Sequence, residues 1–438
     1  MEGRVEQVVK TVGIIAEYQL FHRGHAAQIQ YIRSKLGPRS KIVIALSSYF
    51  TQRGLPALMS PKERAAAALQ AGADLVFLLP QAFSSAEARH FAKGAVCLLA
   101  KTGVIDLLAF GSEVMDKDVF EDALHFLCPE SAELQKEITE GIKAGLSPFQ
   151  ARQEALRKLS CPEEVISMLE QANARLGCEY LCQLKQLSRQ NLRIGYFLCP
   201  RKGQEEKDLE ISKDDFASAT ALRSYLEQRS LQAVFRISDV NKEILDLLSQ
   251  QLPNYSFAEL IHALSVHPLP TAKTLDQLAY RALLNIDNVE SLRKYRYFQN
   301  GLAERLLQSL DKQQFQKNSY FDPTMLSSVN FPPGRIRRAL LSLHLGIHQD
   351  FYKQHGDEPA FLLPLAFNND GRYLLRKMQD KCSLPLLSQI SSIDENSSTT
   401  LKTQILLERR AEILWKELSA YPVSDLLSPP VQIKKRPS

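Results

Sequence analysis

Two histidines surround a glycine near the start of the chain, in the order His22-Arg23-Gly24-His25. Each imidazole can direct a ring N–H at an anionic oxygen, and the glycine allows a ligand to approach the backbone closely. When a nucleophile attacks the α-phosphorus of ATP, negative charge grows on the phosphate oxygens, and fixed donors there lower the barrier by roughly 3 kcal/mol each. We therefore predict that His22 and His25 are catalytic residues of an adenylate-forming enzyme and that Gly24 contacts phosphate. Two histidines placed in a loop by chance are the alternative.

The residues on either side of this segment predict a strand and a helix. Val8 to Ala16 is an apolar, β-branched run, and Gly24 to Leu36 has a helical pattern that ends at Gly37-Pro38. In an open α/β sheet, ligands bind at the carboxyl ends of the strands. The N-terminus of the following helix adds free N–H groups and the positive end of the helix dipole, which favour phosphate.

The first part of the chain repeats this alternation of strand and helix. A good helix start, Ser60-Pro61-Lys62-Glu63, lies among further apolar runs, which are Lys41–Ser47, Leu75–Pro80, Asp106–Phe110 and, later, Leu192–Leu198. Strands this apolar, separated by helices, predict a parallel sheet covered on both faces. We predict a doubly wound α/β domain over residues 1–228.

From about residue 230 onward the chain shows only helical signals. They cover Lys242–Gln251, Lys273–Leu284, Val289–Leu310, Gly334–Leu345 and Leu401–Leu418. We predict a second, all-helical domain over residues 229–438. A length of 438 residues is consistent with two domains, since single cores seldom grow this large.

Composition is that of an ordinary globular protein, with 45% hydrophobic and 24% charged residues. No apolar run is long enough to span a bilayer, so we expect no membrane partner. Seven cysteines, an odd number, do not suggest a disulfide framework, and we expect reduced thiols and a cytoplasmic location. Cys178 and Cys182 lack a further ligand pair, and no metal site is predicted.

Two other segments could complete a phosphate site. Ser218-Ala219-Thr220 stands at a helix start with Arg223 one turn on, so the two hydroxyls and the guanidinium could hold the β- and γ-phosphates. Gly111 follows the fourth strand and allows close approach of a nucleotide. The alternatives are an ordinary helix cap with a surface arginine, and a plain turn.

These residues together resemble one family. GIIAEYQLFHRGH at Gly13–His25 is similar to the GIIVEYNPFHNGH segment of bacterial tRNA(Met) cytidine acetate ligases, which have an HxGH nucleotidyltransferase-like domain. Further similar segments follow in order: Ser47–Ala57, Gly72–Val76 with Leu79-Pro80, Phe110–Glu113, Ala172-Asn173, Ala217–Arg223 and Gly334–Arg338. The resemblance extends from about residue 11 to beyond residue 345.

The resemblance implies a two-step reaction. Acetate attacks the α-phosphate of ATP to give acetyl-adenylate, and the N4 amine of the wobble cytidine in elongator tRNA(Met) then takes the acetyl group. It assigns acetate and ATP to the α/β domain of residues 1–228 and tRNA to the helical domain of residues 229–438. The chemistry of ATP leads us to expect Mg²⁺ as well. With the residues above, the ATP-binding set is Ile15, Ala16, Glu17, Tyr18, Phe21, His22, Gly24, His25, Gln28, Gly111, Asn173, Arg201, Ser218, Thr220 and Arg223.

The chain departs from the family pattern at a few positions. Gln19 and Leu20 stand where the family has Asn-Pro, Ser48 replaces a glycine, and Glu206 and Lys207 replace Tyr and His. Because of these departures, a tRNA-binding protein with reduced catalysis is one alternative interpretation of the sequence. A small-molecule adenylyltransferase is the other alternative, although such an enzyme needs little beyond the α/β domain.

Basic residues interleaved with aromatic ones indicate an RNA surface. Arg335, Arg337 and Arg338 begin one predicted helix, and basic residues 293, 294 and 296 stand beside Tyr295 and Tyr297. The loop Gln52-Arg53-Gly54 follows the second strand and could guide acetate or the anticodon. A solvated helix face is the alternative for the basic helix.

Overall fold

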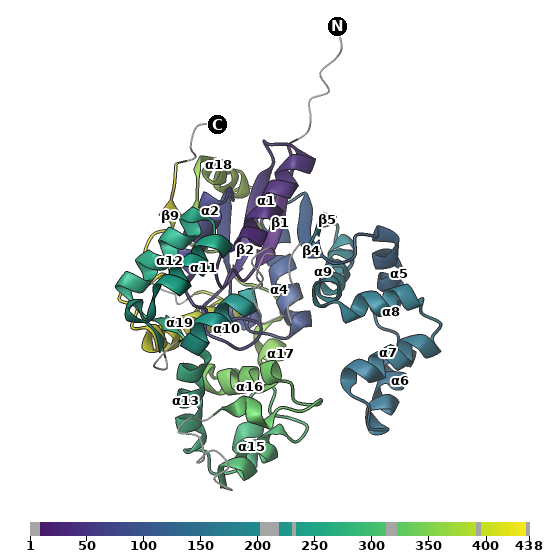
Figure 1. Cartoon of the computed structure of the whole chain (residues 1–438). Coiled ribbons are helices and arrows are strands. Elements are labelled where there is room, and N and C mark those ends of the chain that lie inside the picture. The colour runs from purple at the N-terminus through teal and green to yellow at the C-terminus, as the bar shows by residue number, and fades with distance from the viewer. Residues whose placement is uncertain (1–8, 202–218, 230–233, 312–321, 391–395, 435–438) are drawn as a thin grey trace.

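The computed structural model describes residues 9–201, 219–229, 234–311, 322–390 and 396–434. Its centre is a sheet with the strand order β5-β4-β1-β2-β3-β8-β9 (Figure 1). The first five strands by sequence are mutually parallel: β1 (Thr11–Ala16), β2 (Lys41–Ser47), β3 (Leu75–Leu79), β4 (Leu107–Ser112) and β5 (Gly195–Pro200). The predicted doubly wound parallel sheet is confirmed.

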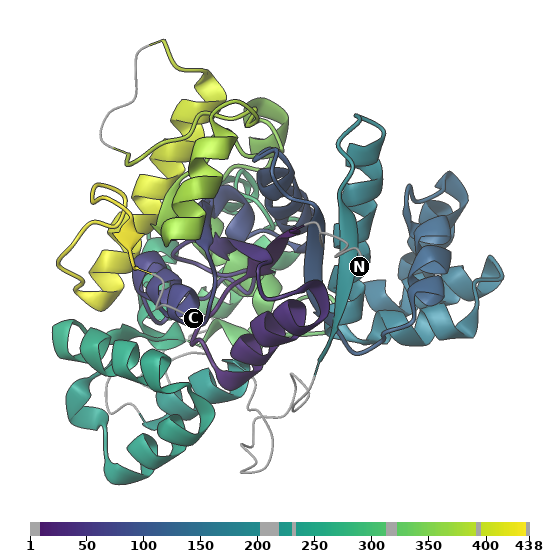
Figure 2. The same ribbon diagram turned by 90° about the horizontal axis from the view of Figure 1, so that it is seen from above.

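Helices cover both faces of the sheet, which explains why its strands are apolar on both sides. Every residue of β3 is buried. On one face lie α1 (Arg23–Leu36) and α2 (Pro61–Gln70), and on the other α4 (Ala88–Ala100) and α9 (Ala172–Ser188) pack together after the short α3 (Gln81–Ser84) (Figure 2). The predicted start of α2 is confirmed, because Ser60 and Glu63 form a reciprocal capping box.

The order of the strands reverses beside β1. Ile14 of β1 lies opposite Ile44 of β2 on one side and Ala109 of β4 on the other. The chain therefore runs outward from β1 to β3 and then crosses over to β4 and β5. The crevice between the carboxyl ends of β1 and β4 is a topological switch point, where ligands bind in this class of sheet.

A small helical lobe extends from one side of the sheet (Figure 1). It is formed by α5 (Lys117–Leu127), α6 (Ala132–Lys143), α7 (Pro148–Lys158) and α8 (Glu163–Glu170). Helices α5 and α8 pack on α9, and α9 in turn packs on β4 and α4. The lobe thus supports a helix that reaches the switch point.

The region after residue 229 is helical for most of its length, as predicted. Its elements are α11 (Lys242–Gln251), α12 (Asn254–Val266), α13 (Ala272–Leu283), α14 (Val289–Arg293), α15 (Leu302–Asp311), α16 (Pro333–Leu345), α17 (Phe351–His355), α18 (Asn369–Met378) and α19 (Thr399–Ser419), with the short 3-10 helices Ile237–Asp239 and Pro323–Leu326. Helices α13 to α16 enclose their own apolar cluster around Phe298 and Leu306.

The expectation that this region is all-helical is wrong in one respect. Strand β8 (Pro364–Phe367) pairs antiparallel with β3, and β9 (Val431–Gln432) pairs with β8. A run of four apolar residues is too short to distinguish strand from helix by its period. A second, two-stranded sheet joins β6 (Val234–Phe235) to β7 (Leu269–Pro270).

Residues from the C-terminal region complete the main core. Trp415 of α19 is fully buried and donates its indole N–H to the carbonyl of Ala57. Asn368, which caps α18, donates to the Asp74 carboxylate beside β3. The domain boundary between residues 228 and 229 stays a prediction, and segments from both sides of it build the main core.

The seven cysteines carry free thiols. Among the described residues, no helix combines the length and the apolar character needed to cross a bilayer.

Candidate active site

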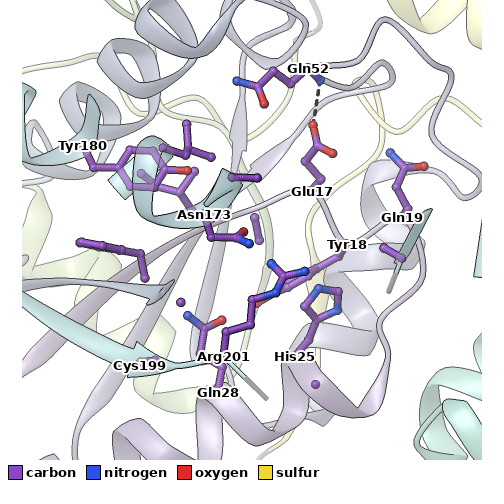
Figure 3. Close-up of a pocket in the computed structure, with 18 of the residues that line it drawn as sticks. Glu17, Tyr18, Gln19, His25, Gln28, Gln52, Asn173, Tyr180, Cys199 and Arg201 are labelled. Atoms are coloured by element: carbon purple, nitrogen blue, oxygen red, sulfur yellow. Dashed lines mark hydrogen bonds between the residues drawn. The ribbon is translucent and has the colours of Figure 1, made fainter. Parts of the chain in front are cut away.

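A cavity of about 580 Å³ opens at the switch point, within the usual range for small-molecule sites (Figure 3). Residues from β1, the start of α1, the end of β4, α9, the end of β5 and α10 (Ala219–Arg229) line it. Twelve residues of the predicted ATP-binding set are among them: Ile15, Ala16, Glu17, Tyr18, His22, Gly24, His25, Gln28, Gly111, Asn173, Arg201 and Thr220. The fold thus gathers segments that lie up to 205 residues apart in the sequence.

His22 and His25 are held by the helix that begins between them. His22 is the N-cap of α1, and its Nδ1 accepts a hydrogen bond from the Gly24 N–H at 3.1 Å. The His25 Nδ1 accepts from the His22 N–H at 3.3 Å, and the two rings stack with their centroids 3.7 Å apart. Because each Nδ1 is an acceptor, each neutral ring carries its proton on Nε2.

The surroundings of both rings favour the neutral form. Burial, and then the positive charge of Arg201, lower the pKa of His22 to about 3. Burial lowers the pKa of His25 well below its usual value, with further contributions from His22 and Arg201. At neutral pH the pair therefore offers two Nε2–H donors and no positive charge.

Two aromatic rings pack against the imidazole of His25. Tyr18 lies 4.5 Å and Phe21 5.4 Å from the imidazole, centroid to centroid. Phe21 is only 2% exposed and is not among the residues that line the cavity, in contrast to the prediction that it contacts ATP. Its apolar side chain instead completes the packing beneath the histidine.

The departure at Gln19 is accommodated by its own contacts. The Gln19 Oε1 accepts from the Leu58 N–H at 3.3 Å and from Arg223 Nη1 at 3.1 Å. Leu20 is 1% exposed and packs in an apolar cluster with Leu222 of α10. The two residues anchor the segment before His22 to α10 and to the loop before α2.

Arg223 does not line the cavity, in contrast to its predicted contact with phosphate. It is 5% exposed, donates to the Pro56 carbonyl at 2.6 Å and forms an ion pair with Glu227 at 2.8 Å. The reason is that Glu227, one turn further along α10, already neutralises it. Thr220 lines the cavity, and Ser218 lies outside the described residues, as do Glu206 and Lys207.

Gly111, at the end of β4, and Asn173, at the start of α9, form one wall of the cavity. A Cβ built on Gly111 meets no atom within 4 Å, so the protein itself leaves this position open. The Asn173 amide donates to the Glu113 carboxylate at 2.5 Å, which fixes the first turn of α9 beside β4. The Arg201 side chain projects toward His25 in Figure 3.

Sequence reasoning missed the rest of the α9 face. Leu176 and Tyr180 follow Asn173 at helical spacings of three and seven residues, and Arg175 and Glu179 stand beside them. All four line the cavity. The helical period counted from Asn173 is the signal that could have found them.

Several residues of the predicted basic surface form contacts within the protein. Arg296 forms an ion pair with Glu87 at 3.0 Å, and the Tyr297 hydroxyl donates to the same carboxylate at 2.5 Å. Arg338 donates to the Gln52 carbonyl at 2.8 Å, and Arg337 pairs with Asp276. Arg338 thus joins the helical region to the cavity wall, and all three arginines are engaged within the protein and are not a free patch.

The described residues do not fit a metal ion bound by the protein alone. Nowhere in the described part of the chain do three His, Cys, Asp or Glu side chains cluster as a metal site. Mg²⁺ that arrives with ATP takes most of its ligands from phosphates and water, so it needs only one or two protein ligands.

Comparison with known proteins agrees with this geometry. The HIGH Nucleotidyl Transferase family model matches residues 9–422. The chain is 30% identical over 400 residues to tRNA(Met) cytidine acetate ligase of Thermoanaerobacter sp. (strain X514), which covers 89% of this chain and 91% of that protein. It is 26% identical over 414 residues to the protein of the same name from Acetivibrio thermocellus, covering 93% and 94%.

Two crystal structures of Thermotoga maritima TmcAL share the fold. The apo form matches with a TM-score of 0.84 and the form bound with alpha-thio ATP with a TM-score of 0.80. Each match is 25% identical and covers 98% of this chain and 100% of the other. The chain therefore belongs to the tRNA(Met) cytidine acetate ligase family of HIGH nucleotidyl transferases.

Proposed function

We propose that this protein activates acetate with ATP and transfers the acetyl group to N4 of the wobble cytidine of elongator tRNA(Met). The observation that carries the proposal is the neutral pair His22 and His25, which directs two N–H donors into a cavity at the switch point of the sheet. Membership of the family supplies the substrates.

In the first step an acetate oxygen attacks the α-phosphorus of ATP, and pyrophosphate leaves. The Nε2–H groups of His22 and His25 stabilise the charge that grows on the phosphate oxygens. The positive end of the α1 helix dipole and the guanidinium of Arg201 add positive potential at the same place. No covalent bond to the protein is needed, because positioning and charge stabilisation carry the step.

We assign ATP binding to the predicted residues that line the cavity. The adenosine lies against the wall of Gly111 and Asn173, where the missing Cβ leaves room for it. The phosphates lie toward His22, Gly24 and Thr220. The ATP analogue in the Thermotoga maritima structure supports a nucleotide in this fold, and we propose that Mg²⁺ accompanies the phosphates.

In the second step the tRNA must bring its cytidine to the same cavity. The loop residues Gln52 and Arg53 line the cavity. The next residue, Gly54, packs so closely on α16 that a Cβ at this position would lie 2.6 Å from the backbone nitrogen of Arg338. We propose that the anticodon approaches along this junction. The guanidinium carbon of Arg335, on α16, lies 5.0 Å from the ring centroid of Phe331. We propose that an unpaired base stacks on this pair.

The proposal implies a cytoplasmic enzyme, and seven free thiols fit a reducing compartment. Its test is an incubation of the purified protein with ATP, radiolabelled acetate and elongator tRNA(Met), with initiator tRNA(Met) as the control. We expect pyrophosphate release that depends on acetate, and label at the wobble cytidine of the elongator only.

Other outcomes select the alternatives. Pyrophosphate release with a small-molecule acceptor but not with acetate would indicate a small-molecule adenylyltransferase. Retention of tRNA without any pyrophosphate release would indicate a catalytically reduced tRNA-binding protein. Either result would overturn the proposed function.

A further inference from the structure

Two carboxylates line the cavity, and they differ in their contacts. The Glu17 Oε1 accepts a hydrogen bond from the Gln52 N–H at 2.8 Å, so it holds the loop after β2 (Figure 3). Glu179 of α9 is partly buried, and no hydrogen bond or ion pair joins its carboxylate to any described residue. A carboxylate that faces a cavity without a protein partner is available to a ligand.

Glu179 lies on α9, the helix whose first turn carries the cavity residue Asn173. Tyr180, the next residue of this helix, lines the cavity as well (Figure 3). Ala88 and Phe91 of α4 also line the cavity, and the charges of Arg89 and Glu87 act on Glu179. The loop residues Gln52 and Arg53, along which we propose that the anticodon approaches, line the same cavity.

The second step needs a group that takes a proton. The N4 amine of cytosine is a hydrogen-bond donor that carboxylates recognise, and it must lose a proton to become an amide. His22 and His25 are unsuitable acceptors, because both Nδ1 lone pairs are used by backbone N–H groups and both Nε2 atoms carry hydrogen. Glu17 already holds Gln52.

We propose that Glu179 is a catalytic residue of acetyl transfer, which binds the N4 amine of the target cytidine and accepts its proton. The inference rests on the proposed function. The N4 lone pair forms a bond to the acetyl carbonyl carbon, and the bond from that carbon to the phosphate oxygen of the adenylate breaks. AMP leaves with that oxygen, and the N4 proton moves to the Glu179 carboxylate.

The charged surroundings of Glu179 suit a base. Burial raises the pKa of its carboxyl, and the negative charges of Glu130 and Glu87 act in the same direction. The positive charges of Arg152 and Arg89 oppose them without reversing the shift. A carboxylate with a raised pKa accepts a proton more readily.

The test compares Glu179→Gln with Glu179→Asp and with Glu164→Gln, a control at an exposed position of the neighbouring helix α8. Acetate-dependent pyrophosphate release reports the first step, and acetylation of elongator tRNA(Met) reports the second. We expect the ratio of transfer to adenylation to fall about 100-fold or more in Glu179→Gln. It should recover partly in Glu179→Asp and stay at the wild-type value in Glu164→Gln.

Two results would overturn the inference. One is a ratio in Glu179→Gln within about threefold of the wild type, and the other is an equal loss of both steps at unchanged melting temperature. If the wild type releases pyrophosphate with acetate but never acetylates tRNA, the proposed function fails, and the inference fails with it. The pH profile adds a readout, since the wild-type transfer rate should fall as Glu179 protonates, and residual transfer in Glu179→Gln should lack this limb.

Discussion

The imidazole rings of His22 and His25 stack 3.7 Å apart, and each uses its Nδ1 to accept a backbone N–H. The pair therefore caps α1 and presents Nε2–H groups to the cavity in one arrangement. The phosphate site has its donors in place before ATP arrives, so little reorganisation is needed during the reaction.

The first expectation concerns the donor role of His25. In His25→Ala we expect acetate-dependent pyrophosphate release to fall about 100- to 1,000-fold, because one donor to the transition state is lost. Retention of tRNA on a filter should change little. His125→Ala, at an exposed position of α5, is the matched control. Equal losses of tRNA retention and pyrophosphate release would contradict this division of labour.

The second expectation is a pH dependence of stability. The pKa of His22 is about 3 in the folded protein, against about 6.5 in the unfolded chain. Between these values the unfolded chain binds the extra proton, so the stability due to neutral His22 is present above pH 6.5 and is lost as the pH falls. By pH 5 the loss reaches up to about 2 kcal/mol.

Urea unfolding of the wild type and His22→Ala at pH 7 and pH 5 measures this effect. The free-energy cost of the substitution should be smaller at pH 5, because the variant lacks the group that titrates. A cost that does not change with pH would mean that His22 is charged or solvated in the folded protein.

The third expectation separates binding from folding at Gly111. A Cβ there meets no protein atom within 4 Å, so Gly111→Ala should leave the free energy of unfolding within about 0.5 kcal/mol of the wild type. The added methyl group should intrude on the nucleotide and raise the Kd for ATP at least about tenfold.

Gly177→Ala is the contrasting variant. Its Cβ would lie 2.5 Å from a ring carbon of Phe110, so it should destabilise the fold by about 1–3 kcal/mol. Calorimetric titration with ATP and urea unfolding of both variants make the comparison. Unaltered ATP affinity in Gly111→Ala would place the nucleotide elsewhere.

The sequence predicted the parallel sheet and twelve of the residues that line the cavity, because those features have local signals or belong to the family motif. Apolar runs such as Lys41–Ser47 are strands at the predicted residues, and the helix predicted over Gly24 to Leu36 spans Arg23–Leu36. The family motif located Gly111, Asn173 and Arg201, which the fold brings to one cavity.

What the sequence could not predict depends on long-range contacts. The return of Pro364–Phe367 to the sheet is decided by the open edge of β3, which lies 285 residues earlier. Arg223 has the spacing of a phosphate ligand, but Gln19 and Glu227 occupy its guanidinium. A spacing cannot reveal that such partners are already present.

The fourth expectation tests the departure at Gln19. Gln19→Asn restores the family residue but shortens the side chain by one methylene, so its amide should no longer reach both Arg223 and the Leu58 N–H. We expect a loss of about 1–2 kcal/mol in the free energy of unfolding, since a buried arginine loses a partner. A double-mutant cycle with Arg223→Lys should show coupling of about 0.5 kcal/mol or more. Additive effects would contradict the contact.

The central claim is that acetate attacks the α-phosphorus of ATP in the cavity beside His22 and His25. Acetate labelled with oxygen-18 tests it most directly, in a reaction with ATP and elongator tRNA(Met) followed by mass spectrometry of the nucleotide product. Because the bridging oxygen of acetyl-adenylate stays with the phosphate, one acetate oxygen should appear in each AMP. AMP without the label, or ADP and phosphate as products, would contradict the account.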